Sequence, residues 1–349
     1  MIYNLHSKTI DALRGVAAAA VFFSHSDASH LATNEWLTAN RGVLGSVGVY
    51  MFFCLSGYLI WRSGLRLIGS PGGLRLYAIH RITRLMPLYL VNLFVVLALI
   101  GYIGSKWVPS HDSWVILRHL VLSQDLYPYV SREINPVLWT LTHEALFYAV
   151  AAVLLMANVR NTSLILAASL VLYAICLAFG VVDYFKFSKV FYAFALGVFI
   201  AEGGHSRRVW ICLITAVLAV YSFVDERFSE YMPALIGVAL TLVFLSLSVE
   251  KKCGRLTSVL MSPIVFLGVV SYSLYIWHYQ VIHIMEYHIG FFERVVPGWA
   301  EYQIIRAVVT VSICVAIAWL SYAMIEKPSM GRLREAVERR TGLTPGIAH

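Results

Sequence analysis

The first long apolar run of the sequence carries three ionisable residues, Asp11, Arg14 and His25. An ionisable side chain in a membrane-spanning helix costs about 2.5 to 3.5 kcal/mol on insertion scales, so three of them indicate a buried polar site. An imidazole can take a proton from an alcohol near neutral pH, and a guanidinium can hold phosphate through its permanently charged fork of donors. The run therefore predicts a site for an elongated compound that is anionic at one end, with proton transfer at the other.

Spacing places Arg14 and His25 on one side of a helix. They are eleven residues apart, which is three helical turns plus about 20°, and they stand about 16 Å apart along the axis. Asp11 precedes Arg14 by three residues and can pair with it, which would orient the guanidinium. Spacing alone leaves two plainer readings open: His25 as a structural hydrogen-bonding residue, and Asp11–Arg14 as a purely structural ion pair.

Two later segments hold further charged residues. RLYAIHRITRLMPLYL puts Arg81 and Arg84 three residues apart on one helical face, although basic residues also belong at cytoplasmic helix ends by default. NPVLWTLTHEALFYAV puts Glu144 inside an apolar run with Trp139 and Tyr148 close by. A carboxylate in that position is costly unless it is paired or protonated. Together with the aromatic neighbours, it favours a polar cavity that binds sugar.

Three more polar residues are weaker candidates. His143 is adjacent to Glu144 but points about 100° away from it on a helix, so we rank Glu144 higher. Ser56, in MFFCLSGYLIW, is followed by Gly57, and small residues of this kind more often serve close helix packing than catalysis. For His278, in SYSLYIWHYQ, a structural and a substrate-binding role are equally plausible.

The composition of the chain indicates what kind of element positions these residues. Hydrophobic residues make up 59% and charged residues 13% of the chain, with a mean hydropathy of +0.73, whereas soluble domains carry about 25% charged residues. A membrane-spanning helix needs about 20 apolar residues. We therefore predict an all-α, polytopic membrane protein with ten spans: Ile10–Ser26, Val43–Trp61, Leu85–Gly104, Val137–Ala157, Leu164–Val182, Phe187–Ala201, Val209–Val224, Tyr231–Val249, Ile264–Met285 and Ile304–Ile325.

The distribution of Lys and Arg predicts the orientation. With a cytoplasmic N-terminus, most of the 27 basic residues, Arg75 and Arg160 among them, fall at cytoplasmic ends of spans. Both termini are thus expected in the cytoplasm, with the chain in an inner (cytoplasmic) membrane. The positive charges are spread over these loops rather than gathered in one patch, which argues against nucleic-acid binding. The five cysteines include no CxxC pair, so we expect neither a zinc site nor a disulfide framework.

Outside the spans, little chain remains for other structure. We expect residues 1–330 to form one transmembrane domain and residues 331–349 a short, charged, solvated cytoplasmic tail. Between the third and fourth spans, Trp114–Leu122 shows an apolar stripe at helical spacing, which fits either an interfacial helix or a loop anchored by aromatic residues.

Taken together, these segments resemble the acyltransferase-3 family of integral-membrane O-acyltransferases. The family signature, an Arg followed by ten residues and a His, is reproduced in IDALRGVAAAAVFFSH by Arg14 and His25. Four further family-like segments follow in the right order: VGVYMFFCLSGYLI, the Arg81–Arg84 pair before RLMPLY, WTLTHEALFY and SYSLYIWHY. One such segment would be weak, but five in order are specific.

The resemblance implies transfer of an acyl group, acetyl from acetyl-CoA, to a hydroxyl of a glycan such as O-antigen, exopolysaccharide or a lipid-linked sugar. Acyl-CoA, the glycan acceptor and membrane lipid are then the expected partners, with no metal. We expect Arg14, Arg81 and Arg84 to hold CoA phosphates and His25 to act as general base or transient acyl carrier. Glu144 would polarise His25 or bind the acceptor, while Trp139, Tyr148, His278 and Ser56 would line the substrate site.

Three alternatives remain open at this point. A transporter or flippase of a glycolipid or acyl donor would also need a polar path through the membrane. A macrolide-type small-molecule O-acyltransferase would use the same chemistry on a different acceptor. A purely structural subunit of a polysaccharide-export complex would tolerate neutral residues at positions 14 and 25.

Overall fold

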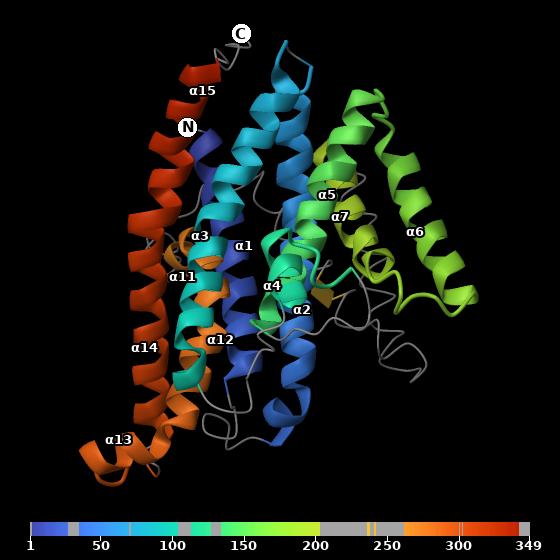
Figure 1. Cartoon of the computed structure of the whole chain (residues 1–349). Helices are drawn as coiled ribbons and strands as arrows, with labels where there is room; N and C mark the ends of the chain where they lie inside the picture. The colour runs from blue at the N-terminus through green and yellow to red at the C-terminus, as the bar shows by residue number, and fades with distance from the viewer. Residues whose placement is uncertain are drawn as a thin grey trace. The chain divides into compact units, whose positions relative to one another are not determined.

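The computed structural model describes residues 2–26, 35–69, 71–103, 113–126, 134–202, 236, 237, 241, 262–299, 301 and 303–341. These residues form helices joined by turns, without a strand among them, which confirms the all-α prediction (Figure 1). The seventh predicted span, Val209–Val224, lies outside the described residues, as does the eighth, Tyr231–Val249, apart from three positions.

The described elements follow one another along the chain as a series of helices. They are α1 (Ile2–His25), α2 (Glu35–Leu67), α3 (Gly73–Ile103), α4 (Ser113–Leu120), the 3-10 turn η2 (Pro136–Leu138), α5 (Trp139–Met156), α6 (Thr162–Ala178), α7 (Phe187–Glu202), α11 (Ser262–Val269), α12 (Ser271–Tyr287), α13 (Ile289–Val295), α14 (Gln303–Ser321), the π-helical turns η4 (Tyr322–Glu326) and η5 (Ser329–Leu333), and α15 (Arg334–Thr341). Of the two readings of Trp114–Leu122, the helical one is confirmed by α4, which ends at Leu120, while its place at the membrane interface stays a prediction.

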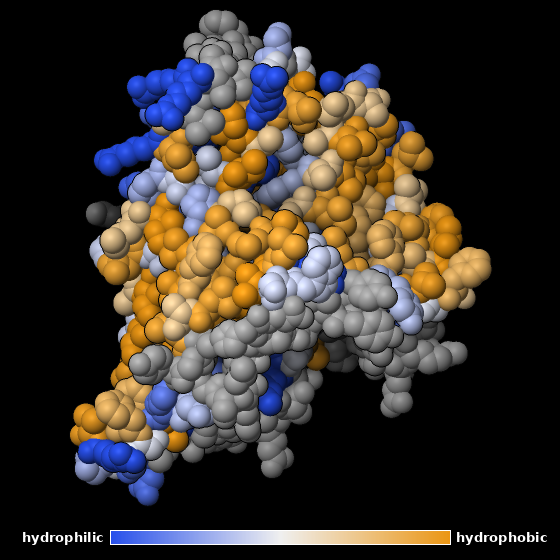
Figure 2. All heavy atoms as spheres, in the orientation of Figure 1, coloured by the Kyte–Doolittle hydropathy of each residue, from blue (hydrophilic) through white to orange (hydrophobic). Residues whose placement is uncertain are grey.

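Several helices are long and apolar enough to cross a membrane. Among the described residues these are Arg41–Leu67, Gly73–Leu99, Pro136–Met156 and Ile304–Arg340. Large apolar side chains point outward on other helices too, such as Leu164 of α6 at 58% exposure, which suits contact with lipid rather than water. On the face in view in Figure 2, hydrophobic side chains line α14, whereas hydrophobic and hydrophilic ones are mixed at α13. The protein is thus a membrane protein, while the count of ten spans and the side of the termini stay predictions.

The ninth predicted span is not one straight helix. Where we expected a continuous run from Ile264 to Met285, α11 and α12 meet at an angle of 81°. The break falls at Val270, whose ψ of 7° departs from helical geometry. Hydropathy averages over a window and does not register a single residue that leaves the helical region, which is why the sequence did not reveal the bend.

The chain divides into two compact units, and each is described by itself. Unit 1 comprises Met1–Phe52, Val96–Val108 and His205–Leu320, and unit 2 comprises Phe53–Val95, Pro109–Gly204 and Ser321–His349. In unit 1, α1 packs against α11 and α12. A Cβ atom at Gly268 would collide with the carbonyl oxygen of Asp11, and one at Gly15 with that of Ile264, so the two glycines let the backbones of α1 and α11 touch.

In unit 2, the second half of α2 packs against α7 by the same device. A Cβ at Gly57 would meet the carbonyl oxygen of Phe194, and one at Gly197 that of Cys54. Phe194 also stacks on Phe147 of α5, with ring centroids 4.4 Å apart. Gly57 is therefore a close-packing residue, as its sequence context indicated.

The chain continues as helix beyond the tenth predicted span. Helical and π-helical turns lead from Ser321 through Pro328 to α15. In unit 2, Glu338 of α15 is 8% exposed, and its Oε1 lies 2.7 Å from Nε2 of His80 in α3. We expected this tail to be solvated, but Glu338 is buried where α15 packs against α3 through this hydrogen bond.

Candidate active site

His25 ends α1 and is partly buried in unit 1. Its Nδ1 lies 2.9 Å from the carbonyl oxygen of Val21, one turn earlier, and 3.3 Å from Nε2 of His278 on α12. Its ring also meets that of Tyr279 edge-on, at a centroid distance of 5.3 Å. The structure thus brings together two of the residues singled out from the sequence, His25 and His278.

These contacts assign the tautomer of His25. In His278, Nδ1 lies 2.7 Å from the carbonyl oxygen of Tyr275 and 3.2 Å from that of Leu274. A carbonyl oxygen only accepts hydrogen bonds, so Nδ1 of His278 carries the proton and Nε2 of neutral His278 is the acceptor. Nδ1 of His25, which faces this acceptor and the Val21 carbonyl, is then also protonated. The basic lone pair of neutral His25 is therefore on Nε2, which makes no hydrogen bond within the described residues.

Asp11 and Arg14 precede His25 on α1, as predicted. Both are partly buried, and each takes part in an interaction within the protein. Asp11 lies where the backbone of α1 touches Gly268 of α11. Their predicted mutual ion pair stays a prediction.

A line of rings runs along α12 from His25. Tyr279 stacks on His283 at 6.3 Å, and His283 stacks on Tyr287 at 6.4 Å. These residues are four apart, so their rings follow one face of the helix. Tyr279 and His283 are partly buried, and Tyr287 is 48% exposed. The rings thus connect the partly buried His25 with the surface of unit 1.

Glu144 occupies a second polar cluster, which lies in unit 2. The hydroxyl of Tyr148 donates to its Oε1 at 2.6 Å, and the hydroxyl of Ser56 approaches the same oxygen at 3.5 Å. The structure therefore brings Glu144, Tyr148 and Ser56 together. Trp139, at the start of α5, instead packs edge-on against Phe53 at a centroid distance of 6.1 Å.

Arg81 borders this cluster. Its guanidinium lies over the ring of Tyr77 at 5.3 Å and over the ring of Tyr148 at 5.4 Å, so two electron-rich faces hold the charge in place. Its buried Nε has no hydrogen-bond partner within the described residues. Arg84, one turn later, directs Nη1 toward the sulfur of Met330 at 3.3 Å. Arg81 thus has a buried donor that no described residue satisfies.

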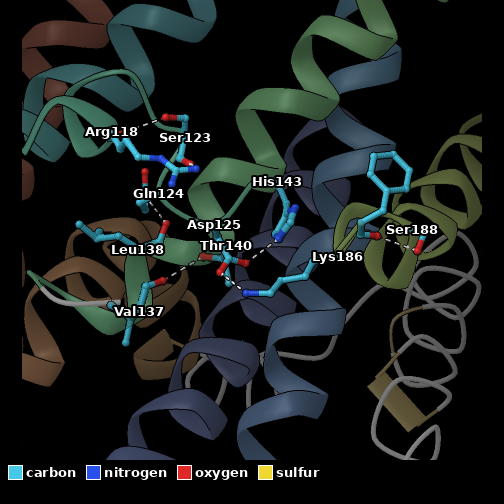
Figure 3. Close-up of polar contacts among 11 residues, drawn as sticks. Arg118, Ser123, Gln124, Asp125, Val137, Leu138, Thr140, His143, Lys186 and Ser188 are labelled. Atoms are coloured by element: carbon cyan, nitrogen blue, oxygen red, sulfur yellow. Dashed lines mark hydrogen bonds and ion pairs between the residues drawn. The ribbon is translucent and has the colours of Figure 1, made fainter. Parts of the chain in front are cut away.

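A third polar network, which sequence reasoning missed, surrounds Asp125 in unit 2 (Figure 3). Nε2 of His143 lies 3.0 Å from one carboxylate oxygen of Asp125, and Nζ of Lys186 lies 2.9 Å from the other. Burial opposes ionisation of Asp125, but these two hydrogen bonds outweigh it and lower the pKa of the carboxyl below its ordinary value. His143 is therefore a partner of Asp125, and the orientation away from Glu144 that the helix predicted is consistent with this.

No local pattern could have revealed that network, because Asp125 and Lys186 are 61 residues apart. The described part of the chain holds no group of three or more His, Cys, Asp or Glu side chains arranged to bind a metal ion. The arginines predicted from the sequence to hold an anionic cofactor are Arg14 in unit 1 and Arg81 and Arg84 in unit 2, and this role stays a prediction.

Comparison with known proteins identifies the family. The Acyl_transf_3 model, described as an acyltransferase domain, matches residues 7–325. The chain belongs to this family. The match covers α1 with Arg14 and His25, the Arg81–Arg84 pair, the Glu144 cluster and α12 with His278. The acyltransferase-3 resemblance predicted from the sequence is thereby confirmed.

Individual relatives agree with the family. The chain is 26% identical over 363 residues to the peptidoglycan O-acetyltransferase OatA of Listeria monocytogenes, covering 92% of this chain and 55% of that protein. It is 23% identical over 397 residues to a Staphylococcus aureus protein named as a candidate O-acetyltransferase, with coverages of 96% and 59%. It is 24% identical over 362 residues to BcsY of Komagataeibacter xylinus, named as a candidate membrane-bound transacylase, with coverages of 93% and 83%.

These matches cover only part of each relative, which limits the functional conclusions that can be transferred to this chain. The chain spans little more than half the length of the Staphylococcus and Listeria relatives, 59% and 55%. No solved structure matches the chain. The acyltransferase-3 domain is thus shown by the family match, while the acyl donor and acceptor are matters for proposal.

Proposed function

We infer that this acyltransferase-3 domain moves an acetyl group from acetyl-CoA to a hydroxyl of a glycan, such as a cell-envelope polysaccharide or a lipid-linked sugar, in the cytoplasmic membrane of a bacterium. The observation that carries this inference is the tautomer of His25. Two carbonyls orient His278, and His278 with the Val21 carbonyl keeps the proton of His25 on Nδ1. A general base needs an unoccupied lone pair, and Nε2 of His25 provides one.

The chemical step follows from that arrangement. The acceptor hydroxyl gives its proton to Nε2 of His25 while its oxygen bonds to the thioester carbonyl carbon of acetyl-CoA. The carbon–sulfur bond then breaks, the CoA thiolate leaves, and it takes up the proton held by His25. In the second route, Nε2 attacks the thioester carbonyl carbon and the carbon–sulfur bond breaks, so that the CoA thiolate leaves. The acceptor oxygen then attacks the acetyl-imidazolium carbon, the bond to Nε2 breaks, and the hydroxyl proton passes to the thiolate. Both routes depend on the same nitrogen atom.

The donor is held by guanidinium groups in this proposal. CoA carries phosphates at one end, and Arg side chains bind phosphate through charge-assisted, paired hydrogen bonds. The candidates are Arg81 and Arg84, three residues apart in unit 2, and, separately, Arg14 in unit 1. The unpartnered buried Nε of Arg81, fixed between two tyrosine rings, supports its part in binding.

The acceptor is proposed to approach along the rings of α12. Tyr279, His283 and Tyr287 offer a continuous aromatic surface that becomes more exposed away from His25. Aromatic rings present an apolar face with polar edges, which suits the mixed surface of a sugar ring. Glu144 in unit 2, whose Oε1 accepts a hydrogen bond from Tyr148, is a candidate for binding the acceptor.

The decisive experiment measures transfer of radiolabelled acetyl from acetyl-CoA to polysaccharide in membranes. Wild type is compared with His25→Ala and Arg14→Ala at matched expression. His288→Ala, a change of another partly buried histidine in unit 1, serves as the control. We expect transfer in wild type and control and a loss of roughly 10² to 10⁴-fold in His25→Ala. Equal labelling in all variants would exclude the proposed roles, and no label in wild type would favour another donor or a transporter.

A further inference from the structure

A pocket of 460 Å³ lies in unit 2 at the turn between α2 and α3. It is lined by the end of α2, this turn, the first residues of α3 and the end of α5. The lining residues are Gly64, Leu65, Ile68, Gly69, Gly72, Gly73, Leu74, Arg75, Leu155, Met156 and Arg160. None of them belongs to the clusters around His25, Glu144 or Asp125.

The charge of the pocket is positive. Its lining includes two arginines, Arg75 and Arg160, and no acidic residue. Both are exposed, and neither makes a hydrogen bond or ion pair within the described part of the chain. Neighbouring arginines differ in this respect, since Arg62 donates to the hydroxyl of Tyr58 and Arg66 to the carbonyl of Arg62. Two guanidinium groups on one pocket wall with all their donors available fit an anion such as phosphate.

The backbone at the start of α3 also favours binding of an anion in this pocket. At the start of α3, helical hydrogen bonding begins with the N–H of Leu76, which donates to the carbonyl of Gly72. The N–H groups at the start of a helix have no partner inside it and form its positive end. Gly72 has φ of +72°, a conformation that glycine adopts without strain. No atom lies within 4 Å of a Cβ built on Gly69. This side of the turn is therefore open to a ligand.

The rest of the lining is apolar and faces outward. Leu74 is 40% and Met156 60% exposed, and Val153, one turn before Met156, is 64% exposed. α3 and α5 both contain segments apolar enough to span a membrane. On the topology predicted from the basic residues, Arg75 and Arg160 lie at the cytoplasmic ends of their helices, where the membrane leaflet carries anionic lipids. A soluble phosphate compound would use the arginines but would leave these apolar side chains without a partner.

We propose that this pocket binds the phosphate headgroup of an anionic membrane phospholipid. Arg75 and Arg160 contact the phosphate oxygens, and Leu74 and Met156 contact the first part of the acyl chains. The bound lipid thereby contacts both the α2–α3 turn and the end of α5. This site is separate from the proposed acyl transfer, and its test does not depend on it.

The test uses the full chain in nanodiscs of phosphatidylcholine, with or without phosphatidylglycerol. Retained lipid is identified by native mass spectrometry, and the thermal unfolding midpoint is measured alongside. The variant is Arg75→Gln with Arg160→Gln. The control, Arg332→Gln with Arg340→Gln, removes the same charge from two exposed arginines elsewhere in unit 2. Size-exclusion chromatography confirms that all forms are folded.

We expect wild type and control to retain phosphatidylglycerol and to be stabilised by it. The Arg75/Arg160 variant should bind it roughly tenfold more weakly, because each basic residue near the membrane surface contributes a modest electrostatic attraction. Equal retention in variant and control would overturn the proposal. So would equal, Arg75- and Arg160-dependent stabilisation by inorganic phosphate or adenosine 3′,5′-bisphosphate in pure phosphatidylcholine, since the ligand would then be a soluble phosphate compound.

Discussion

Nε2 of His278 lies 3.3 Å from Nδ1 of His25, although the two residues are 253 positions apart in the sequence. His278 is 1% exposed and its own Nδ1 is committed to backbone carbonyls. It is therefore a positioning residue for His25.

Replacing His278 with Phe keeps a ring in place but removes the acceptor that faces His25. We expect kcat to fall roughly tenfold to a hundredfold, because part of the general-base contribution depends on the orientation and tautomer of His25. KM for acetyl-CoA should change little. His278→Gln, whose amide oxygen can accept the same hydrogen bond, should retain more activity than His278→Phe. Equal loss in both variants would point to packing alone.

Replacing Arg81 with Lys keeps the charge but loses the planar group that lies between Tyr77 and Tyr148. We expect KM for acetyl-CoA to rise roughly tenfold, since a charge-assisted hydrogen bond contributes about 1.5 to 3 kcal/mol. KM for the acceptor should stay the same. Arg118→Lys, another partly buried arginine of unit 2, is the matched control. An unchanged donor KM would remove Arg81 from the donor site.

Replacing Tyr287 with Ala removes the exposed end of the line of rings on α12. Acceptor KM should rise several-fold because a sugar ring loses one stacking surface. Acetyl-CoA hydrolysis without acceptor should not change. Phe291→Ala removes a ring of similar size that is 60% exposed on α13, and it should leave both quantities as in wild type. A parallel effect of the two substitutions would contradict an acceptor path along α12.

Replacing Asp125 with Asn leaves Lys186 and His143 without their shared carboxylate. We expect a loss of about 2 to 4 kcal/mol in the free energy of unfolding, since the carboxylate is buried but Lys186 is partly exposed. Asp183→Asn, which affects an exposed ion pair with Lys189, should have little effect. Thermal unfolding in detergent at neutral pH measures both.

The same carboxylate predicts a pH dependence. The pKa of Asp125 is lower in the folded protein than its ordinary value of 3.8. The ionised form thus stabilises the fold above pH 3.8, and this contribution is lost as the pH falls through the lowered folded pKa. Asp125→Asn should therefore approach wild-type stability in strong acid. A constant difference down to the lowest pH at which the protein folds would contradict this assignment.

Replacing Gly57 with Ala introduces a Cβ where the carbonyl of Phe194 already lies. We expect destabilisation of about 1 to 3 kcal/mol, the usual cost of overpacking. Gly42→Ala, on the same helix with no atom within 4 Å of the added carbon, should be neutral or slightly stabilising because alanine favours helix. Similar unfolding midpoints for the two variants would argue against close contact between α2 and α7.

The local sequence pattern was sufficient to predict the helices of this protein and to place several candidate site residues on them. Apolar runs of sufficient length predicted the helices, because a helix satisfies its backbone hydrogen bonds within its own segment and needs only a run of suitable residues. Eleven-residue spacing alone placed Arg14 and His25 on one helix, and three-residue spacing did the same for Arg81 and Arg84. Each family-like segment around these residues could also be recognised from its own local sequence. The family membership that they indicated is confirmed by the family match.

Only the tertiary structure decided which of these residues meet. The contact of His25 with His278, the sharing of Asp125 by His143 and Lys186, and the bend of 81° between α11 and α12 depend on how helices pack. Helical periodicity repeats every 3.6 residues and says nothing about partners hundreds of residues away. Such pairs are set by side-chain volume and close backbone approach at positions such as Gly15 and Gly268, where the absence of a side chain lets α1 and α11 touch.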